Sequence, residues 1–189
     1  MYEYKEILGI ITIIIAVVSY SAYFFNIFTT CTLPRTTSWF IWGLLNTIAF
    51  FVQYESGAGY GAWVTGFTAV MCLAISAISF FKCDEHLTKY DWIPLLGAFI
   101  AIILWYITDD ALIAIIITTV TYTLGFIPTL HNAYFHPEEE TATTFGLNSL
   151  KFLISLFAIE SLSLTTWLYP FTLVILNAIL ASVIVLRRK

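Results

Sequence analysis

The strongest constraint on this chain is an internal repeat that lies within apolar sequence. Residues 13–21 (IIIAVVSYS) reappear 102 positions later as residues 115–123 (IIITTVTYT), and both copies stand in long runs without charge. At an offset of 104, residues 63–77 and 167–181 share seven identical positions. The repeat predicts two copies of one membrane-embedded unit, because such runs match the length that a bilayer requires.

The composition supports a membrane location. Hydrophobic residues make up 60% of the chain and charged residues only 11%, whereas soluble domains carry roughly 25% charged residues. A formal net charge of −4 excludes a nucleic-acid partner, since phosphate binding needs a basic face. We therefore expect the lipid bilayer to be the main surrounding, in a bacterial inner (plasma) membrane.

Seven segments are long and apolar enough, or nearly so, to cross a bilayer as helices. They comprise residues 7–28, 39–54, 57–81, 92–108, 111–130, 144–160 and 165–186. The repeat equates the first with the fifth and the third with the seventh, so that both units point the same way. The predicted fold is an all-α integral membrane protein with seven transmembrane helices in a 3+1+3 arrangement of two parallel three-helix repeats. The repeats cover residues 1–82 and 110–189, and a connector covers residues 83–109.

The distribution of lysine and arginine predicts the orientation. The side reached by the odd-numbered loops and the C-terminus holds six of these cations: Arg35, Lys82, Lys89, Arg187, Arg188 and Lys189. The opposite side holds Lys5 alone. The positive-inside rule then places the N-terminus outside and the C-terminus in the cytosol. The acidic start, with Glu3 and Glu6, does not match a signal peptide, so we expect the first segment to remain in the mature chain.

One motif gives a family resemblance. The fifth segment contains Gly125-Phe126-Ile127-Pro128-Thr129 near its inner end, and with the 3+1+3 order this resembles the SWEET and PQ-loop superfamily of membrane transporters. That family has a Pro-Gln pair in the first helix of each unit, where this chain has Phe25-Asn26 and Pro128-Thr129. The resemblance implies a binding asparagine in the third and seventh helices. Asn177 fits the seventh, and Leu73 stands at the matching position of the third.

A second resemblance rests on two short motifs. Residues 37–42 (TSWFIW) and His136-Pro137-Glu138 are similar to those of an uncharacterised family of small bacterial membrane proteins. This similarity implies no function.

A polar stripe recurs in the second helix of both units. The first copy carries Trp42, Asn46, Ala49 and Gln53 on one helical face, and the second copy carries Thr144, Asn148, Lys151 and Ser155. We expect Asn46 and Asn148 to face each other across the pseudo-axis. Their amides suit solute binding and helix–helix hydrogen bonding equally well.

Further candidates lie in the first, fifth and sixth helices. Tyr20 and Tyr122 occupy matched positions in the repeat. Gly125 and Pro128 mark a hinge, because proline removes a backbone hydrogen bond. Lys151 is the one charged residue well inside a predicted span, and we expect its stem to carry the amine to the headgroups or into a structural ion pair, with substrate contact as the alternative.

The sequence carries no motif for phosphate, zinc or nucleophilic chemistry, so we expect neither an enzyme nor a cofactor, and ATP-driven pumping by this chain alone is excluded. His131 and His136 near three glutamates form a weak metal-site candidate, which a solvated acidic loop explains better. The three cysteines, Cys31, Cys72 and Cys83, are expected to be free thiols.

The predicted function is transport of a small polar solute by alternating access between the two three-helix units, at a site that includes Tyr20, Trp42, Asn46, Gln53, Tyr122, Asn148, Lys151 and Asn177. The alternative is a membrane receptor or accessory subunit that binds a small ligand in the same cavity without moving it. The residue pattern leaves the oligomeric state and the identity of the solute open.

Overall fold

The structure is a computed structural model, and it describes residues 3–29, 36–82, 89–108 and 110–188. Over these ranges the chain is helical and contains no strand. The helices are α1 Glu3–Thr29, α2 Thr36–Glu55, η1 Gly59–Ala62, α3 Trp63–Lys82, α4 Lys89–Thr108, α5 Ala111–Phe135, η2 Pro137–Glu139, α6 Ala142–Ala158 and α7 Leu164–Arg187. Cys31, Cys83, Arg35 and Lys189 lie outside the described residues, and nothing is described of the side chains of Lys82 and Lys89.

Each predicted span coincides with one α-helix. Four helical stretches are long and apolar enough to cross a membrane, namely α1, residues 59–81, α5 and α7. The shorter α6 is also apolar. The protein is therefore an all-helical chain with the properties of an integral membrane protein. Many large apolar side chains of α1 face outward, among them Ile7, Ile14, Val18 and Phe28, as expected of a surface in contact with lipid.

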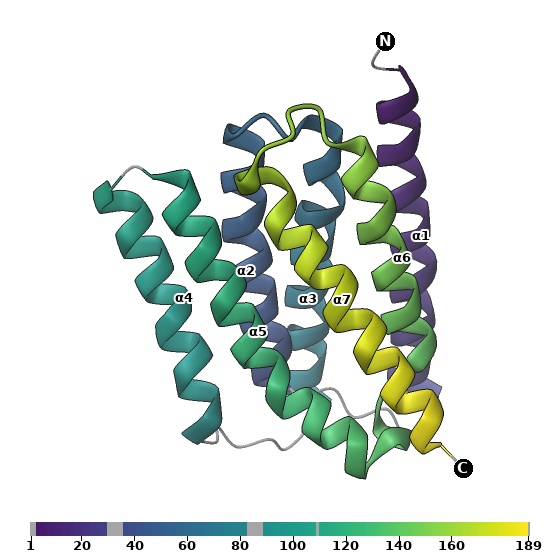
Figure 1. Cartoon of the computed structure of the whole chain (residues 1–189). Helices are drawn as coiled ribbons and strands as arrows, with labels where there is room; N and C mark the ends of the chain where they lie inside the picture. The colour runs from purple at the N-terminus through teal and green to yellow at the C-terminus, as the bar shows by residue number, and fades with distance from the viewer. Residues whose placement is uncertain (1–2, 30–35, 83–88, 109, 189) are drawn as a thin grey trace.

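The helices are arranged as one bundle (Figure 1). α1, α3, α5 and α7 run in one direction, and α2, α4 and α6 run in the other. α3 packs against α1 and α2, and α7 packs against α5 and α6. α1 also packs along α6, and α2 packs along α5, while α4 lies at the edge against α5 and α2. The helices of the two halves of the chain therefore meet along two seams.

Local sequence explains where α5 and α7 begin. The Oδ1 of Asp110 accepts hydrogen bonds from the backbone N–H groups of Leu112 (2.8 Å) and Ile113 (3.2 Å), which caps α5. Ser163 and Thr166 form a reciprocal capping box at the start of α7. α5 continues through Pro128 to Phe135, five residues past its predicted end at residue 130, so the proposed hinge lies within a continuous helix.

Candidate binding site

A small cavity lies at the centre of the bundle, where six of the seven α-helices converge. Its volume is about 10 Å³, roughly enough for one water molecule. Every lining residue is at most 5% exposed, so the cavity is closed both to solvent and to lipid. The lining consists of Tyr20 from α1, Trp39 and Trp42 from α2, Thr68 and Cys72 from α3, Tyr122 from α5, Phe145, Asn148 and Phe152 from α6, and Asn177 from α7.

Lys151 lies directly beside this cavity. Its side chain is 0% exposed, and its Nζ donates hydrogen bonds to Thr68 Oγ1 at 2.9 Å and to Tyr20 OH at 3.3 Å. The same Nζ lies 4.3 Å from the centre of the Tyr20 ring, within the range of a cation–π interaction. The expectation that the amine extends to the headgroups is therefore wrong. The short, buried path from α6 to the α1–α3 interface holds the amine in the interior.

The Lys151 ammonium has no carboxylate partner in the described part of the chain. Two hydroxyl groups and the aromatic rings of Tyr20 and Phe152 surround it instead. The expected structural ion pair is thus absent among the described residues. Because a buried charge is costly unless it is paired, this arrangement is the most unusual electrostatic feature of the bundle.

Asn148 connects α6 to α1 at the edge of the cavity. Its Oδ1 accepts a hydrogen bond from Ser19 Oγ (3.3 Å), and Ser19 Oγ also donates to the carbonyl of Thr144 (3.1 Å). Thr144 Oγ1 in turn donates to the carbonyl of Ser19 at 3.4 Å. The Ser19 hydroxyl thus shares its one hydrogen between two acceptors, and the amide N–H groups of Asn148 are its donors at the cavity.

Aromatic rings form the other wall of the cavity. Trp42 packs against Trp39 (5.3 Å between ring centres), Tyr122 (5.9 Å) and Phe126 (5.5 Å). Tyr122 also contacts Tyr169 edge to face at 5.6 Å. The Nε1–H of Trp42 has no acceptor among the described residues, although the side chain is buried. An unsatisfied buried donor beside a cavity is a position that a ligand or a water can satisfy.

The other predicted asparagines differ in their roles. Asn177 lines the cavity, and its Nδ2 donates to the carbonyl of Leu173 at 2.8 Å. Asn46 is fully buried but does not line the cavity, and its Nδ2 donates to the carbonyl of Trp42 at 2.8 Å. Of the two residues expected to hold a shared solute, Asn148 lines the cavity and Asn46 does not, and solute binding stays a prediction. Asn46 contacts the site only through the backbone of Trp42.

Gln53 is also outside the cavity. Its Oε1 accepts a hydrogen bond from Thr65 Oγ1 at 3.1 Å, and its backbone carbonyl accepts from Ala58 N–H at 2.9 Å. Gln53 therefore stabilises the turn between α2 and α3. The residues that the sequence interpretation missed are Trp39, Thr68, Cys72, Phe145 and Phe152. Their spacing gave a signal, because Phe145, Asn148 and Phe152 share one helical face, as do Thr68 and Cys72.

Burial corrects the alignment of α3 with α7. At the offset of 104 given by residue identity, Ile75 (0% exposed) is paired with Ile179 (44% exposed). At an offset of 105, Ile75 is paired with the buried Leu180, and Cys72 with Asn177. Cys72, not Leu73, is thus the spatial counterpart of Asn177, and both line the cavity.

A larger depression of about 530 Å³ lies on the outside of α1, α2 and α3. Its lining is almost entirely apolar, and the hydroxyl of its one threonine, Thr47, already donates to the carbonyl of Gly43 at 2.8 Å. Trp63 lies in this depression and is 40% exposed. This surface lacks the polar groups that orient a solute.

One end of the bundle is closed by two loops. The backbone N–H groups of Glu160 and Ser161 donate to the carbonyls of Ala58 and Gly57, each at 3.1 Å. Lys5 Nζ donates to the carbonyl of Ile159 at 2.7 Å and so ties α1 to the same place. The loops that precede α3 and α7 are therefore joined above the cavity by main-chain hydrogen bonds.

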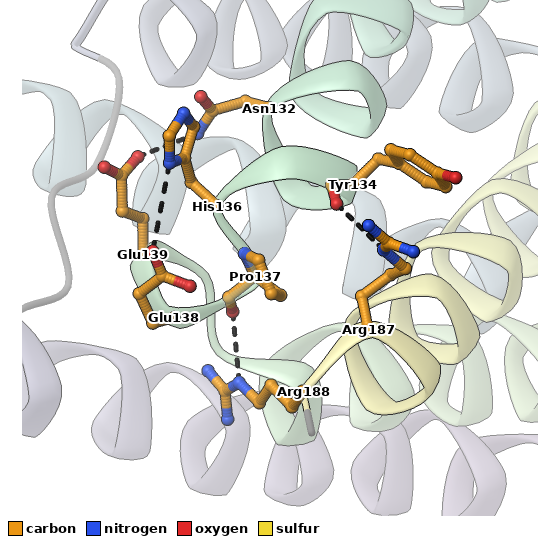
Figure 2. A network of polar contacts seen from close by, with 8 residues as sticks. All are labelled: Asn132, Tyr134, His136, Pro137, Glu138, Glu139, Arg187 and Arg188. Atoms are coloured by element: carbon orange, nitrogen blue, oxygen red, sulfur yellow. Dashed lines mark hydrogen bonds and ion pairs between the residues drawn. The ribbon is translucent and has the colours of Figure 1, made fainter.

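The other end is held by the last residues of α7. Arg187 Nε donates to the carbonyl of Tyr134 at 3.2 Å, and its guanidinium lies 4.2 Å from the centre of the Tyr134 ring. Arg188 Nε donates to the carbonyl of Pro137 at 3.0 Å (Figure 2). These contacts fasten α7 to the end of α5 and to the turn that leads into α6.

The weak metal-site candidate lies in that same turn. His136 Nδ1 is 3.9 Å from Glu138 Oε1, and Glu139 accepts a hydrogen bond from Asn132 Nδ2 at 3.0 Å (Figure 2). Across the described ranges, no three His, Cys, Asp or Glu side chains are placed to hold a metal ion. Glu138 and Glu139 instead contact His136 and Asn132 near the end of α5.

Comparison with known proteins adds no assignment. No family model, no curated protein and no solved structure matches the chain significantly.

Proposed function

We propose that this chain is a membrane carrier that moves a small polar solute by alternating access, with the central cavity as its site. The carrier consists of two parallel three-helix repeats, α1–α3 and α5–α7, joined by α4 as a connector. The observation that carries the proposal is the enclosed cavity itself, because its polar and aromatic lining is supplied by all six of these helices. A site at the contact between repeats is where relative movement of the repeats exposes a solute to either side.

The packing pattern supports a repeat. α3 stands to α1 and α2 as α7 stands to α5 and α6, and the α1–α6 contact has its counterpart in the α2–α5 contact (Figure 1). The matched helices run in the same direction. These relations are those of a two-fold axis along the bundle, which two parallel repeats require.

The burial pattern supports it independently. At an offset of 102, the buried residues Ala16, Ser19 and Tyr20 of α1 correspond to buried residues of α5, namely Thr118, Thr121 and Tyr122. The stripe of α2 that starts at Trp42 corresponds in the same way to Thr144, Asn148, Lys151 and Ser155 of α6. Lipid-facing and interior faces thus coincide in the two copies.

The carrier is in a closed state. The paired loops cover one end of the cavity, and Tyr23, Trp39 and Phe126, all buried, fill the bundle on the other side of the site. Opening requires the α1–α6 and α2–α5 seams to slide or separate in turn. Gly125 and Pro128 lie in α5 and provide the bending point in this mechanism.

Orientation follows from the positive-inside rule, which places the paired loops and Lys5 outside and the arginines of α7 in the cytosol. The proposed membrane is the bacterial inner (plasma) membrane. The proposed 3+1+3 topology agrees with the resemblance to the SWEET and PQ-loop superfamily. The residues proposed to bind the solute are those that line the cavity of this chain.

Reconstitution into liposomes tests the proposal. Counterflow of a panel of small radiolabelled solutes is expected to show saturable movement, which Asn148→Leu abolishes because it removes an amide from the cavity. The matched control is Asn132→Leu, since Asn132 is bonded to Glu139 at the end of α5, away from the cavity. Both variants must elute as folded protein.

The same experiment separates the alternative function. If purified protein binds a solute through Asn148 but never moves it, the chain is a receptor or accessory subunit. If no solute is either bound or moved, the cavity is only a packing defect and the carrier proposal fails.

A further inference from the structure

We propose that the central cavity accepts a small carboxylate anion. This inference rests on the proposed function for its site, but it concerns the charge of the solute. It is carried by the juxtaposition of the buried Lys151 amine with hydroxyl, indole and amide donors around one enclosed space.

The Lys151 amine is buried without an anionic partner among the described residues. Lys151 is 0% exposed and lies at mid-length of α6, far from the ends of the helix. Among the described residues, the carboxylates of Glu6, Glu139 and Glu160 bind partners at the two ends of the bundle. Nothing anionic in the described residues offsets the ammonium, and buried charges are normally paired. An anion bound in the cavity would supply a partner for the amine and favour its protonated form.

The hydrogen bonds donated by Lys151 restrict where the hydroxyl hydrogens of Thr68 and Tyr20 can point. An ammonium group has three donors and no acceptor, so in its bonds to Thr68 Oγ1 and Tyr20 OH it occupies an oxygen lone pair of each hydroxyl. The hydrogen of each hydroxyl must then point to another acceptor. Thr68 and Tyr20 both line the cavity, so the Thr68 O–H can point into it as a donor polarised by the neighbouring cation. The Tyr20 O–H can do the same by giving up its long contact with Cys72 Sγ, which lies 4.0 Å away.

Two further lining residues, Trp42 and Asn148, carry N–H donors. Trp42 Nε1–H is a donor without an acceptor in the described structure, and an indole can never accept. Asn148 has its Oδ1 engaged by Ser19, which leaves its N–H groups. Four donors on four helices thus surround a space with no anionic lining residue. Neutral solutes such as sugars present donors and acceptors in mixture and would leave several of these groups unsatisfied.

The volume and the lining of the cavity restrict the size and the shape of the solute. The cavity has room for about one water, so the solute must be small and the walls must part slightly to admit it. The planar carboxylate accepts bonds at two oxygens, and an apolar remainder suits the rings of Trp39, Phe145 and Phe152. A carboxylate with a short apolar chain satisfies both halves of the lining.

The test compares a carboxylate with its amide, which has a similar size but no charge and carries an NH2 donor in place of one acceptor oxygen. We expect purified full-length protein to bind lactate at least about tenfold more tightly than lactamide, as measured by the ligand dependence of the unfolding temperature. Nitrate, a planar anion without an apolar part, is expected to bind more weakly than lactate. Equal binding of lactate and lactamide, or binding of nitrate but not lactate, overturns the proposal.

Variants then locate the charge effect. Lys151→Met is expected to weaken lactate binding at least about tenfold while lactamide binding changes less than about twofold. Lys5→Met is the control, because Lys5 binds the carbonyls of Ile159 and Glu160 at the end of the bundle. Trp42→Phe, with Trp63→Phe as its control, removes one donor and is expected to weaken lactate binding if Lys151→Met does not fold. Unchanged lactate binding in Trp42→Phe overturns the proposal.

Counterflow of the same probes separates the two proposals. Binding of lactate without movement supports the anion site and removes the carrier function. Movement of lactamide or another neutral solute, without preference for lactate, supports the carrier function and removes the anion site.

Discussion

Lys151 Nζ and Thr68 Oγ1 lie 2.9 Å apart, and this single hydrogen bond joins the middle of α6 to the first half of α3. The two residues come from different halves of the chain, 83 positions apart. Their bond fixes both the position of the buried cation and the direction in which the Thr68 hydroxyl can donate. The stability of the bundle and the chemistry of the cavity therefore depend on the same contact.

Thr68→Val is expected to destabilise the fold. It removes an acceptor from the Lys151 ammonium, and hydrogen bonds to charged groups contribute about 1.5–3 kcal/mol. The free energy of unfolding in detergent micelles should decrease by about that amount. Thr172→Val is the control, since Thr172 Oγ1 donates only to the carbonyl of Leu168 in its own helix (2.9 Å), and it should change stability by less than about 0.5 kcal/mol. Equal effects of the two variants would show that Thr68 is not a significant partner of Lys151.

Lys151→Met is expected to keep or raise stability while it removes anion binding. Taking an ammonium out of water costs several kcal/mol, and methionine fills a similar volume without that cost. Lys151→Ala leaves a void and should lose about 2–5 kcal/mol. Chemical denaturation of the two variants measures the difference. A methionine variant as unstable as the alanine variant would mean that the hydrogen bonds of the amine outweigh its desolvation.

Gly61→Val is expected to separate the paired loops. A Cβ at Gly61 would lie 2.6 Å from the Ile159 side chain and 2.9 Å from its Cα, so the loop before α7 must move. In a background where Cys31 and Cys83 are replaced by serine, the buried Cys72 should then react faster with a small water-soluble thiol reagent.

Gly146→Val is the matched control for that experiment, because a Cβ at Gly146 meets nothing within 4 Å. Its Cys72 labelling rate should equal that of the parent protein. If Gly61→Val also leaves the rate unchanged, the paired loops are not what closes this end of the cavity.

Asp110→Ala is expected to fray the start of α5. The carboxylate accepts from two backbone N–H groups, and loss of such a cap costs about 0.5–2 kcal/mol. Asp110→Asn retains an acceptor at the same position and should preserve most of the stability. Hydrogen exchange at residues 111–114 provides the local measurement, and equal exchange in the alanine variant and the parent would contradict the role of the cap.

The sequence predicted the helices well because bilayer-spanning segments have a strong length and composition signal. The burial of α1 and α5 agrees with the register of the predicted repeat, since Tyr20 and Tyr122, which it matches, are both buried. In α3 and α7, the alignment on identical residues differs by one position from the alignment in which buried residues coincide. Ile179 faces outward, where any apolar residue is tolerated, so its identity with Ile75 carries little positional information.

The site was predicted only in part, for reasons of packing. Helical spacing located Asn46 and Asn148 on equivalent faces, but the amide of Asn46 bonds to the backbone of its own helix, which spacing alone does not reveal. Lys151 was misjudged because distance to the helix end was known and the presence of Tyr20 and Thr68 beside it was not. Partners contributed by distant segments are the information that a single sequence lacks.

The residue of the first copy that corresponds to Lys151 is Ala49, which is equally buried. A symmetrical dimer of two second halves would place two ammonium groups, which repel each other, in one narrow space. A dimer of two first halves would place no ammonium group there. Joining unlike halves in a single polypeptide, as we propose, gives one buried cation beside the central cavity. In the proposed pair of repeats, the central site is therefore asymmetric, because the two copies differ at this buried position.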